Sequence, residues 1–169
     1  MMSLVGMEIV GLVISGMVAL VFGCLVLLNQ PKQVAARFFF LAVLGIGGWA
    51  LGIAAFLPMT DAQSALPFIQ SYYVAAALIA VAMLSVSITA SGGRAVGGLI
   101  YASWVSFAVL ALFIIFRPDF MISGVNIATQ NTVSLNPVGY VAYSIYFITL
   151  FGATLSTLIG RSMREKKLS

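Results

Sequence analysis

The chain has 169 residues, of which 62% are hydrophobic and 7% are charged. A water-soluble domain of this length needs more charge on its surface, so the composition excludes an ordinary soluble globular protein. The net charge is +4, but the basic residues lie at the ends of long apolar runs. That placement favours a lipid bilayer as the partner and argues against nucleic acid.

Titratable side chains are scarce. Histidine is absent, and the four acidic residues, Glu8, Asp61, Asp119 and Glu165, all avoid the middle of an apolar run. General acid–base catalysis and most metal sites need histidine or clustered carboxylates. The single cysteine, Cys24, cannot form an internal disulfide or build a thiolate metal site by itself. We therefore expect no enzyme activity, no metal and no cofactor.

Five apolar runs are long enough to cross the hydrocarbon core of a bilayer, which takes about 20 helical residues. In chain order they are Ile9–Leu28, Phe38–Leu57, Phe68–Ala90, Ala95–Phe116 and Val138–Gly160. Turn-forming residues separate them: Asn29 and Pro31, Pro58 to Pro67, Ser91-Gly92-Gly93, Pro118, and Pro137. This pattern predicts an all-α integral membrane protein, with a five-transmembrane-helix bundle as a single membrane domain over residues 1–169.

The charges predict an orientation for this bundle. One side receives Lys32, Arg37, Arg94, Arg161, Arg164, Lys166 and Lys167. The other side receives Glu8, Asp61, Asp119 and a single basic residue, Arg117. We expect the chain to lie in the inner (cytoplasmic) membrane. By the positive-inside rule, its N-terminus is then outside and its C-terminus is in the cytoplasm. The polar stretch Asn29–Arg37 is then a cytoplasmic hairpin loop.

The first and second runs carry small residues at helical spacing: Gly11, Ser15, Ala19 and Gly23, then Gly48 and Gly52. Small residues let membrane helices approach closely. The same pattern serves a dimerisation face or packing within one monomer, and we favour packing within the monomer. An oligomer remains open.

The segment Arg117–Pro137 alternates apolar and polar residues on both sides of the polar stretch "ATQNT". Val125 and Ile127 flank Asn126, and Val133 and Leu135 flank Ser134. A period of two predicts a short extracellular β-hairpin between helices 4 and 5. It would be either a lid over an external ligand site or, as we favour, a connector too polar to enter lipid.

Aromatic residues suggest a ligand pocket near the outer face. Tyr140, Tyr143, Phe147 and Phe151 recur at spacings of three and four, which places them on one side of the fifth helix. Further aromatic surface comes from Trp49, Tyr72, Tyr73, Tyr101 and Trp104. The candidate ligand-binding residues are Tyr72, Tyr73, Tyr140, Tyr143 and Arg117. Core packing and interfacial anchoring explain the same residues, and we favour that interpretation.

The apolar runs lack the charged or visibly broken segments of transporters, and they contain no lysine that could hold retinal. The basic tail, residues 161–169, is expected to lie on the anionic leaflet. It also offers a docking strip for a signalling protein or for a partner in a membrane complex.

The run "LLNQPKQVAARFFFLAVLGIGGWALGIAAFL", with Asn29, Arg37, Phe38 and Trp49, resembles the start of the N-terminal seven-span sensor region of bacterial histidine kinases. The resemblance continues through "FIQSYYVAAALIAVAMLSVSI" and "DFMISGVN", and then "VSLNPVGYVAYSIYFI". It implies a sensory, signal-transducing input module.

That family has seven spans followed by an output domain, whereas this sequence has five runs and no histidine. The resemblance therefore implies a sensor portion without its own output domain, either truncated or acting on a partner in trans. The alternative is a structural or accessory subunit of a larger membrane complex. A membrane enzyme or transporter is the least favoured of the three.

Overall fold

The computed structural model describes residues 4–90, 97–127 and 131–166. The elements are α1 (Leu4–Asn29), α2 (Val34–Phe56), α3 (Ala62–Ala90), α4 (Gly97–Phe116), α5 (Pro118–Met121), β1 (Ile122–Asn126), β2 (Thr132–Leu135) and α6 (Pro137–Lys166). Within these ranges five helices, α1, α2, α3, α4 and α6, are long and apolar enough to cross a membrane. This confirms the predicted spans and indicates a multi-pass membrane protein.

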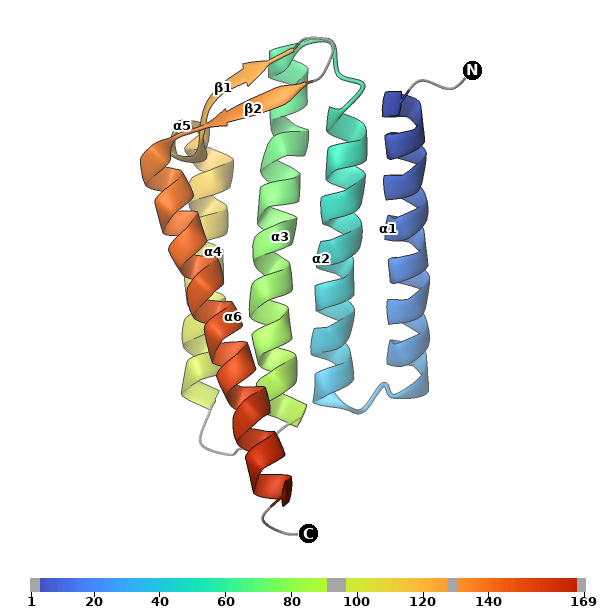
Figure 1. Ribbon diagram of the computed structural model, residues 1–169, viewed down its shortest axis with the longest axis vertical. Coiled ribbons are helices and arrows are strands. Elements are labelled where there is room, and N and C mark those ends of the chain that lie inside the picture. The colour runs from blue at the N-terminus through green and yellow to red at the C-terminus, as the bar shows by residue number, and fades with distance from the viewer. Residues whose placement is uncertain (1–3, 91–96, 128–130, 167–169) are drawn as a thin grey trace.

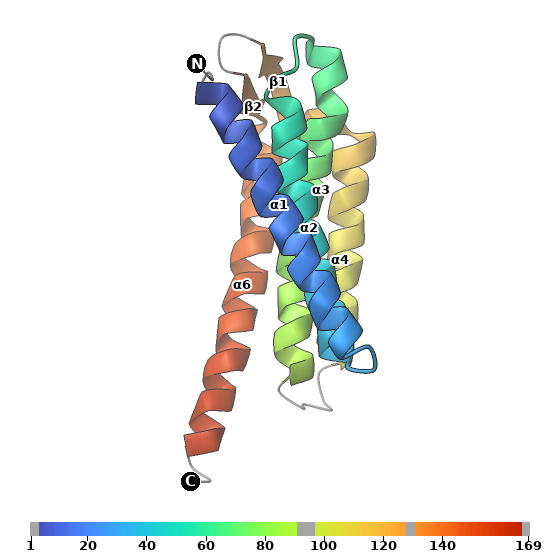
Figure 2. The same ribbon diagram turned by 90° about the vertical axis from the view of Figure 1, so that its right-hand side faces the viewer.

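Helix α3 is the centre of the bundle. Helices α1, α2 and α3 form one layer, and α4 and α6 lie on opposite sides of it (Figures 1 and 2). α3 packs against α2, α4 and α6, whereas α1 packs on α2 at the far edge of the layer. The side chains of Ile69, Val81 and Leu84 on α3 are accordingly fully buried. The bundle is thus open on the side where α2 and α6 flank α3.

Two boundaries differ from the prediction because helices continue through residues that the sequence analysis assigned to a break or to the tail. α3 begins at Ala62, so Pro67 lies inside it. The Asp61 carboxylate caps this start, accepting a hydrogen bond from the Ser64 backbone N–H at 2.7 Å. A proline in the second turn removes only one hydrogen bond near the helix start. At the other end, α6 continues through Lys166, so part of the predicted tail is helical.

The predicted hairpin between the last two long helices is present as a two-stranded antiparallel sheet. Val125 pairs with Val133 and Gly124 with Ser134, and the register shifts between Ile122 and Gly124. The short helix α5 before it was not predicted. The loop Ser91–Arg94, the hairpin residues 128–130 and the last residues 167–169 lie outside the described part of the chain.

Three helices have their last carbonyl groups satisfied by a side chain from another element. The Gln70 amide of α3 donates to the carbonyls of Ile114 and Ile115 in α4, at 2.8 and 3.0 Å. The Asn131 amide lies within hydrogen-bond distance of three carbonyl oxygens at the end of α2, those of Phe56, Leu57 and Met59.

The third such bond joins α6 to the end of α3. The Arg161 guanidinium donates to the Ala90 carbonyl at 3.0 Å. The last four carbonyls of a helix have no partner within it, so these bonds close helix ends that lipid could not satisfy. In the first turn of α2, Arg37 donates through Nε to the carbonyl of Pro31, in the loop before that helix, at 3.1 Å.

Candidate functional site

Helix α2 approaches α3 very closely. A Cβ atom added at Gly45 would lie 2.8 Å from Ile79 Cγ1 and 2.9 Å from the Ala75 carbonyl oxygen. One added at Gly52 would lie 2.8 Å from Tyr72 Cβ. Only glycine permits this spacing, which fixes α2 against one side of α3.

Helix α6 is held on the adjacent face of α3 by tyrosine hydroxyls instead of small residues. Tyr143 donates to the Tyr73 carbonyl at 2.9 Å, and Tyr146 donates to the Ala77 carbonyl at 3.0 Å. The two acceptor carbonyls are one turn apart on α3, so both tyrosines bond to the same face of that helix. This leaves α2 and α6 as the two walls of a groove with α3 as its floor.

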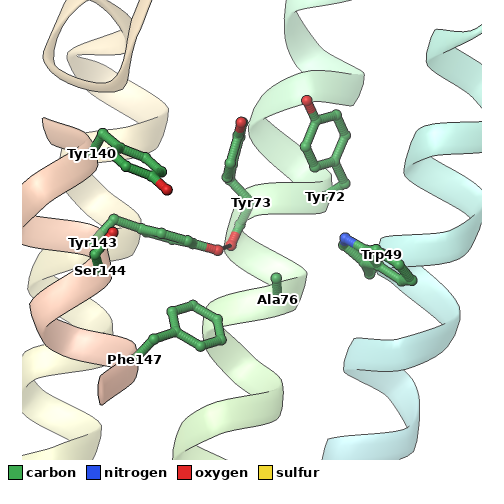
Figure 3. A pocket seen from close by; sticks show the side chains of 8 residues that line it. All are labelled: Trp49, Tyr72, Tyr73, Ala76, Tyr140, Tyr143, Ser144 and Phe147. Atoms are coloured by element: carbon green, nitrogen blue, oxygen red, sulfur yellow. Dashed lines mark hydrogen bonds between the residues drawn. The ribbon is translucent and has the colours of Figure 1, made fainter. Parts of the chain in front are cut away.

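The groove has a volume of about 300 Å³. Trp49 comes from α2, and Tyr72, Tyr73 and Ala76 come from α3. Figure 3 shows the Trp49 indole reaching toward the groove from the α2 side, with its nitrogen directed at the α3 tyrosines. Trp49 keeps 40% of its surface exposed, so the groove opens to the outside of the bundle and not into its core.

Helix α6 supplies the facing wall through Tyr140, Tyr143, Ser144 and Phe147. The Tyr143 ring packs edge-on against Tyr73, with centroids 5.5 Å apart, and lies 4.9 Å from the Phe147 ring. Tyr72 and Tyr73 lie 4.6 Å apart on the floor. The groove is therefore lined by aromatic rings on its floor and on both walls.

Among the residues that the structure describes, the Trp49 indole N–H and the hydroxyls of Tyr140 and Ser144 have no hydrogen-bond partner, and the hydroxyls of Tyr72 and Tyr73 have only each other. The Trp49 nitrogen and the Tyr140 hydroxyl point into the groove from opposite sides (Figure 3). Most other serine and threonine hydroxyls of the long helices donate to a carbonyl of the preceding turn. The groove therefore contains hydrogen-bond donors without an acceptor, at a depth in the bundle where the helices are otherwise apolar.

The structure brings four of the five predicted ligand-binding residues together, namely Tyr72, Tyr73, Tyr140 and Tyr143. Arg117 lies elsewhere, in a shallow apolar hollow with Leu112, Phe113 and Phe116 of α4. Ser144 and Trp49 were not among the predicted ligand-binding residues. A signal for Trp49 was present in the sequence, because it lies among small and aliphatic residues in the half of its run that is nearer the hairpin.

The remaining predicted aromatic surface is divided between other places. Tyr101 is 73% exposed on α4. Trp104 lies in a separate cluster, where its indole N–H donates to the Ser85 hydroxyl at 3.0 Å and its ring packs 5.8 Å from Phe107.

The small residues predicted for helix packing have different surroundings. Gly23 is buried, and a Cβ there would lie 2.7 Å from Val43 of α2. Ala19 is half-buried, whereas Gly11 and Ser15 are exposed. The contact face of α1 also includes Gly16, which was not among the residues predicted for helix packing.

On α2, Gly52 is buried against α3. A Cβ at Gly48 would lie 3.3 Å from the Ala75 side chain, so this residue also faces α3 although it is exposed.

A second hollow of about 310 Å³ lies at the hairpin end of the bundle. Gln63 and Leu66 of α3, Asp119 of α5 and Ser123 of β1 are among its lining residues. Nearby, hydrogen bonds from the backbone N–H and hydroxyl of Ser64 lower the pKa of Asp61 below its usual value. Both acids are close to helix starts, where a negative charge is favourable.

A comparison of the chain with protein-family models, with curated proteins and with solved structures found no match.

Proposed function

We propose that this chain is a membrane-embedded sensory input module, of the kind that precedes the output domains of bacterial sensor histidine kinases. Its ligand site is the groove between α2, α3 and α6. In this proposal the chain lies in the inner membrane with its hairpin outside and the end of α6 in the cytoplasm. It binds a ligand and passes the change to a signalling partner, and it performs no chemistry itself.

One observation supports this proposal most. Tyr143 belongs to the groove and also holds α6 on α3 through its hydroxyl. A ligand that contacts Tyr143 therefore acts on one of the bonds that set the position of α6. A ligand shifts an equilibrium between two helix arrangements only by binding one of them better. Tyr143 is where such a difference in affinity would arise.

Helix α6 runs without a break from the groove to the opposite end of the bundle. Its last turns carry Arg161, which is bonded to the end of α3. A rotation of α6 at Tyr143 would be felt at Arg161 and in the basic residues that follow it. These residues are the proposed docking site for a signalling protein in the cytoplasm.

The test measures whether α6 moves. In a Cys24→Ser background, cysteines replace Val34 and Met163, both exposed near the same end of the bundle, and carry spin labels. Pulsed EPR compares nanodiscs of synthetic phosphatidylcholine with nanodiscs made from the lipid extract of native membranes. We expect the distance distribution to shift between the two, and to shift in synthetic lipid when Tyr143 is replaced by Phe.

Tyr146→Phe is the matched control, since its hydroxyl also bonds α3 but Tyr146 does not line the groove. This variant should keep the response to native lipid. Identical distributions in both lipids would overturn the sensory proposal.

The orientation has its own test. In the same Cys24→Ser background, Thr132→Cys should react with a membrane-impermeant maleimide added to intact cells, and Met163→Cys should not. Both residues are exposed, so accessibility within the protein does not limit either reaction. The reverse pattern would refute the proposed orientation.

The alternative function is an accessory subunit of a larger membrane complex. The exposed Gly11 and Ser15 on the outer side of α1 favour it, because a neighbouring helix could approach there closely. Purification from native membranes in mild detergent separates the two functions. Stoichiometric recovery with a membrane assembly, abolished by Gly11→Leu, would support the accessory function over the sensory one.

A further inference from the structure

We infer that the ligand of the groove is a lipid-soluble quinone-type ring, neutral and planar, with a carbonyl oxygen on each of two opposite sides. It enters sideways from the bilayer between α2 and α6. This inference rests on the proposed function for the use of the groove as a ligand site, and it adds the chemical class of the ligand.

The unpaired donors define where the ligand must accept hydrogen bonds. The Trp49 indole is a donor only, and it faces the groove from α2, while the Tyr140 hydroxyl faces it from α6 (Figure 3). Donors left unpaired in hydrocarbon cost several kcal/mol each, by the general estimate for polar groups in lipid. A molecule with one acceptor toward each wall satisfies both, and the carbonyls of a quinone are placed in that way.

The lining also decides the charge of the ligand. The eight residues that line the groove include no acidic or basic side chain. A phosphate or carboxylate head group would lie at this depth without a cation to pair with, which is strongly unfavourable. The ligand head is therefore neutral.

Shape and depth favour a ring. The floor and walls carry Tyr72, Tyr73, Tyr143 and Phe147, whose faces and edges suit a flat unsaturated ring. A volume of about 300 Å³ is at the small end for ligand sites and suits a ring head group better than a whole lipid.

Trp49 lies seven residues before the end of α2 at Phe56, which is about 10 Å along the helix. A ring bound there would have its tail in the acyl region, and the open side of the groove lets that tail remain in the bilayer. An ester lipid shares the carbonyl chemistry but lacks the paired, opposite acceptors.

The test measures equilibrium retention of a ubiquinone analogue with a decyl tail. The full chain is placed in nanodiscs of synthetic phosphatidylcholine, with empty nanodiscs as the background. We expect saturable retention at one molecule per chain. Trp49→Phe and Tyr140→Phe should each weaken it about threefold to tenfold, the range for loss of one neutral hydrogen bond. Tyr101→Phe, an exposed tyrosine on α4 away from the groove, should leave it unchanged.

Two results would overturn the inference. One is equal retention in wild type, Tyr140→Phe and Tyr101→Phe, which means that the quinone only dissolves in the bilayer. The other is displacement of the quinone by an equal concentration of monoolein, which would assign the groove to a neutral ester lipid.

The unfolding temperature of every variant is measured, so that a folding defect is not mistaken for lost binding. Tyr→Phe keeps the ring and its packing and should leave the fold intact. The two proposals also fail separately. Quinone retention without movement of α6 would leave the ligand assignment standing and refute the sensor. Movement of α6 in native lipid without quinone retention would support the sensor and refute the ligand assignment.

Discussion

The two faces of α3 that border the groove are built in opposite ways. Toward α2, glycines bring the backbones together, and a Cβ at Gly45 or Gly52 would overlap atoms of α3. Toward α6, large aromatic side chains keep the backbones apart, and hydroxyls of Tyr143 and Tyr146 cross the gap. One interface depends on the absence of side chains and the other on their length.

This difference separates a fixed part of the bundle from an adjustable one. Close backbone packing allows few alternative arrangements, because a small slide brings atoms into overlap. A hydroxyl can exchange one acceptor for another nearby at small cost, and interhelical hydrogen bonds in membranes are worth only about 0.6 kcal/mol on average. We therefore expect α1, α2 and α3 to act as a scaffold and α6 to be the element that responds.

The largest expected effect comes from Gly139, in the first turn of α6. An added Cβ would overlap the Phe120 carbonyl oxygen of α5, and backbone atoms cannot move aside as a flexible side chain can. Gly139→Ala should lower the free energy of unfolding by about 3 kcal/mol, the upper end for overpacking. Thermal unfolding in detergent measures it.

Gly152→Ala is the control for that experiment, since α6 has open space there. It should be neutral or slightly stabilising, because alanine favours a helix more than glycine does. Equal effects of the two substitutions would show that the start of α6 is not held by α5.

The next effect tests the α2–α3 interface. Gly45→Ala places a methyl group against the Ala75 carbonyl and Ile79, and should cost about 1–2 kcal/mol after the gain in helix propensity. The same substitution at Gly11, which faces open space, should cost nothing. Equal unfolding midpoints of the two variants would contradict the fixed character of this interface.

The tyrosine variants test the α3–α6 interface. Tyr143→Phe and Tyr146→Phe each remove one hydrogen bond to α3, and each should cost about 0.6 kcal/mol. Both should increase hydrogen exchange of α6 amides, measured by mass spectrometry, while α2 stays unchanged. A change in α2 of equal size would mean that the two interfaces are not independent.

The smallest effect concerns Asp61, which caps α3 and belongs to neither interface. Its pKa is lowered in the folded chain by the hydrogen bonds from Ser64, so its contribution to stability is present above the usual aspartate pKa. That contribution is lost as the pH falls below about 4. The difference in unfolding midpoint between wild type and Asp61→Ala should shrink over that range. A difference that is constant with pH would refute the charged cap.

The number of long helices followed from hydropathy alone, because a bilayer demands about 20 apolar residues per crossing. The hairpin followed from the alternation around Asn126 and Ser134, which the register of the two strands matches. The predicted start of α3 was too late, because Asp61 caps a helix that begins at Ala62 and Pro67, in its second turn, removes only one hydrogen bond near the helix start.

The candidate site was predictable only in part. Periodicity placed Tyr140 and Tyr143 on one side of a helix, but it could not tell that α2 would stand across from them. That depends on the glycine contacts of α2 with α3, because they determine which side of α2 carries Trp49 toward the groove. Arg117 was predicted as a ligand-binding residue together with these tyrosines, but its backbone position after α4 places it elsewhere.

The hydrogen bonds between helix ends and distant side chains can form only in a fixed order while the chain is synthesised. Gln70 emerges from the ribosome before the α4 carbonyls that it binds, 44 and 45 residues later. The end of α2 must wait 74 to 75 residues for Asn131, and the end of α3 waits 71 residues for Arg161. The end of α2 is therefore completed when the hairpin arrives, and the end of α3 only when α6 does, which makes α6 the element that finishes the bundle.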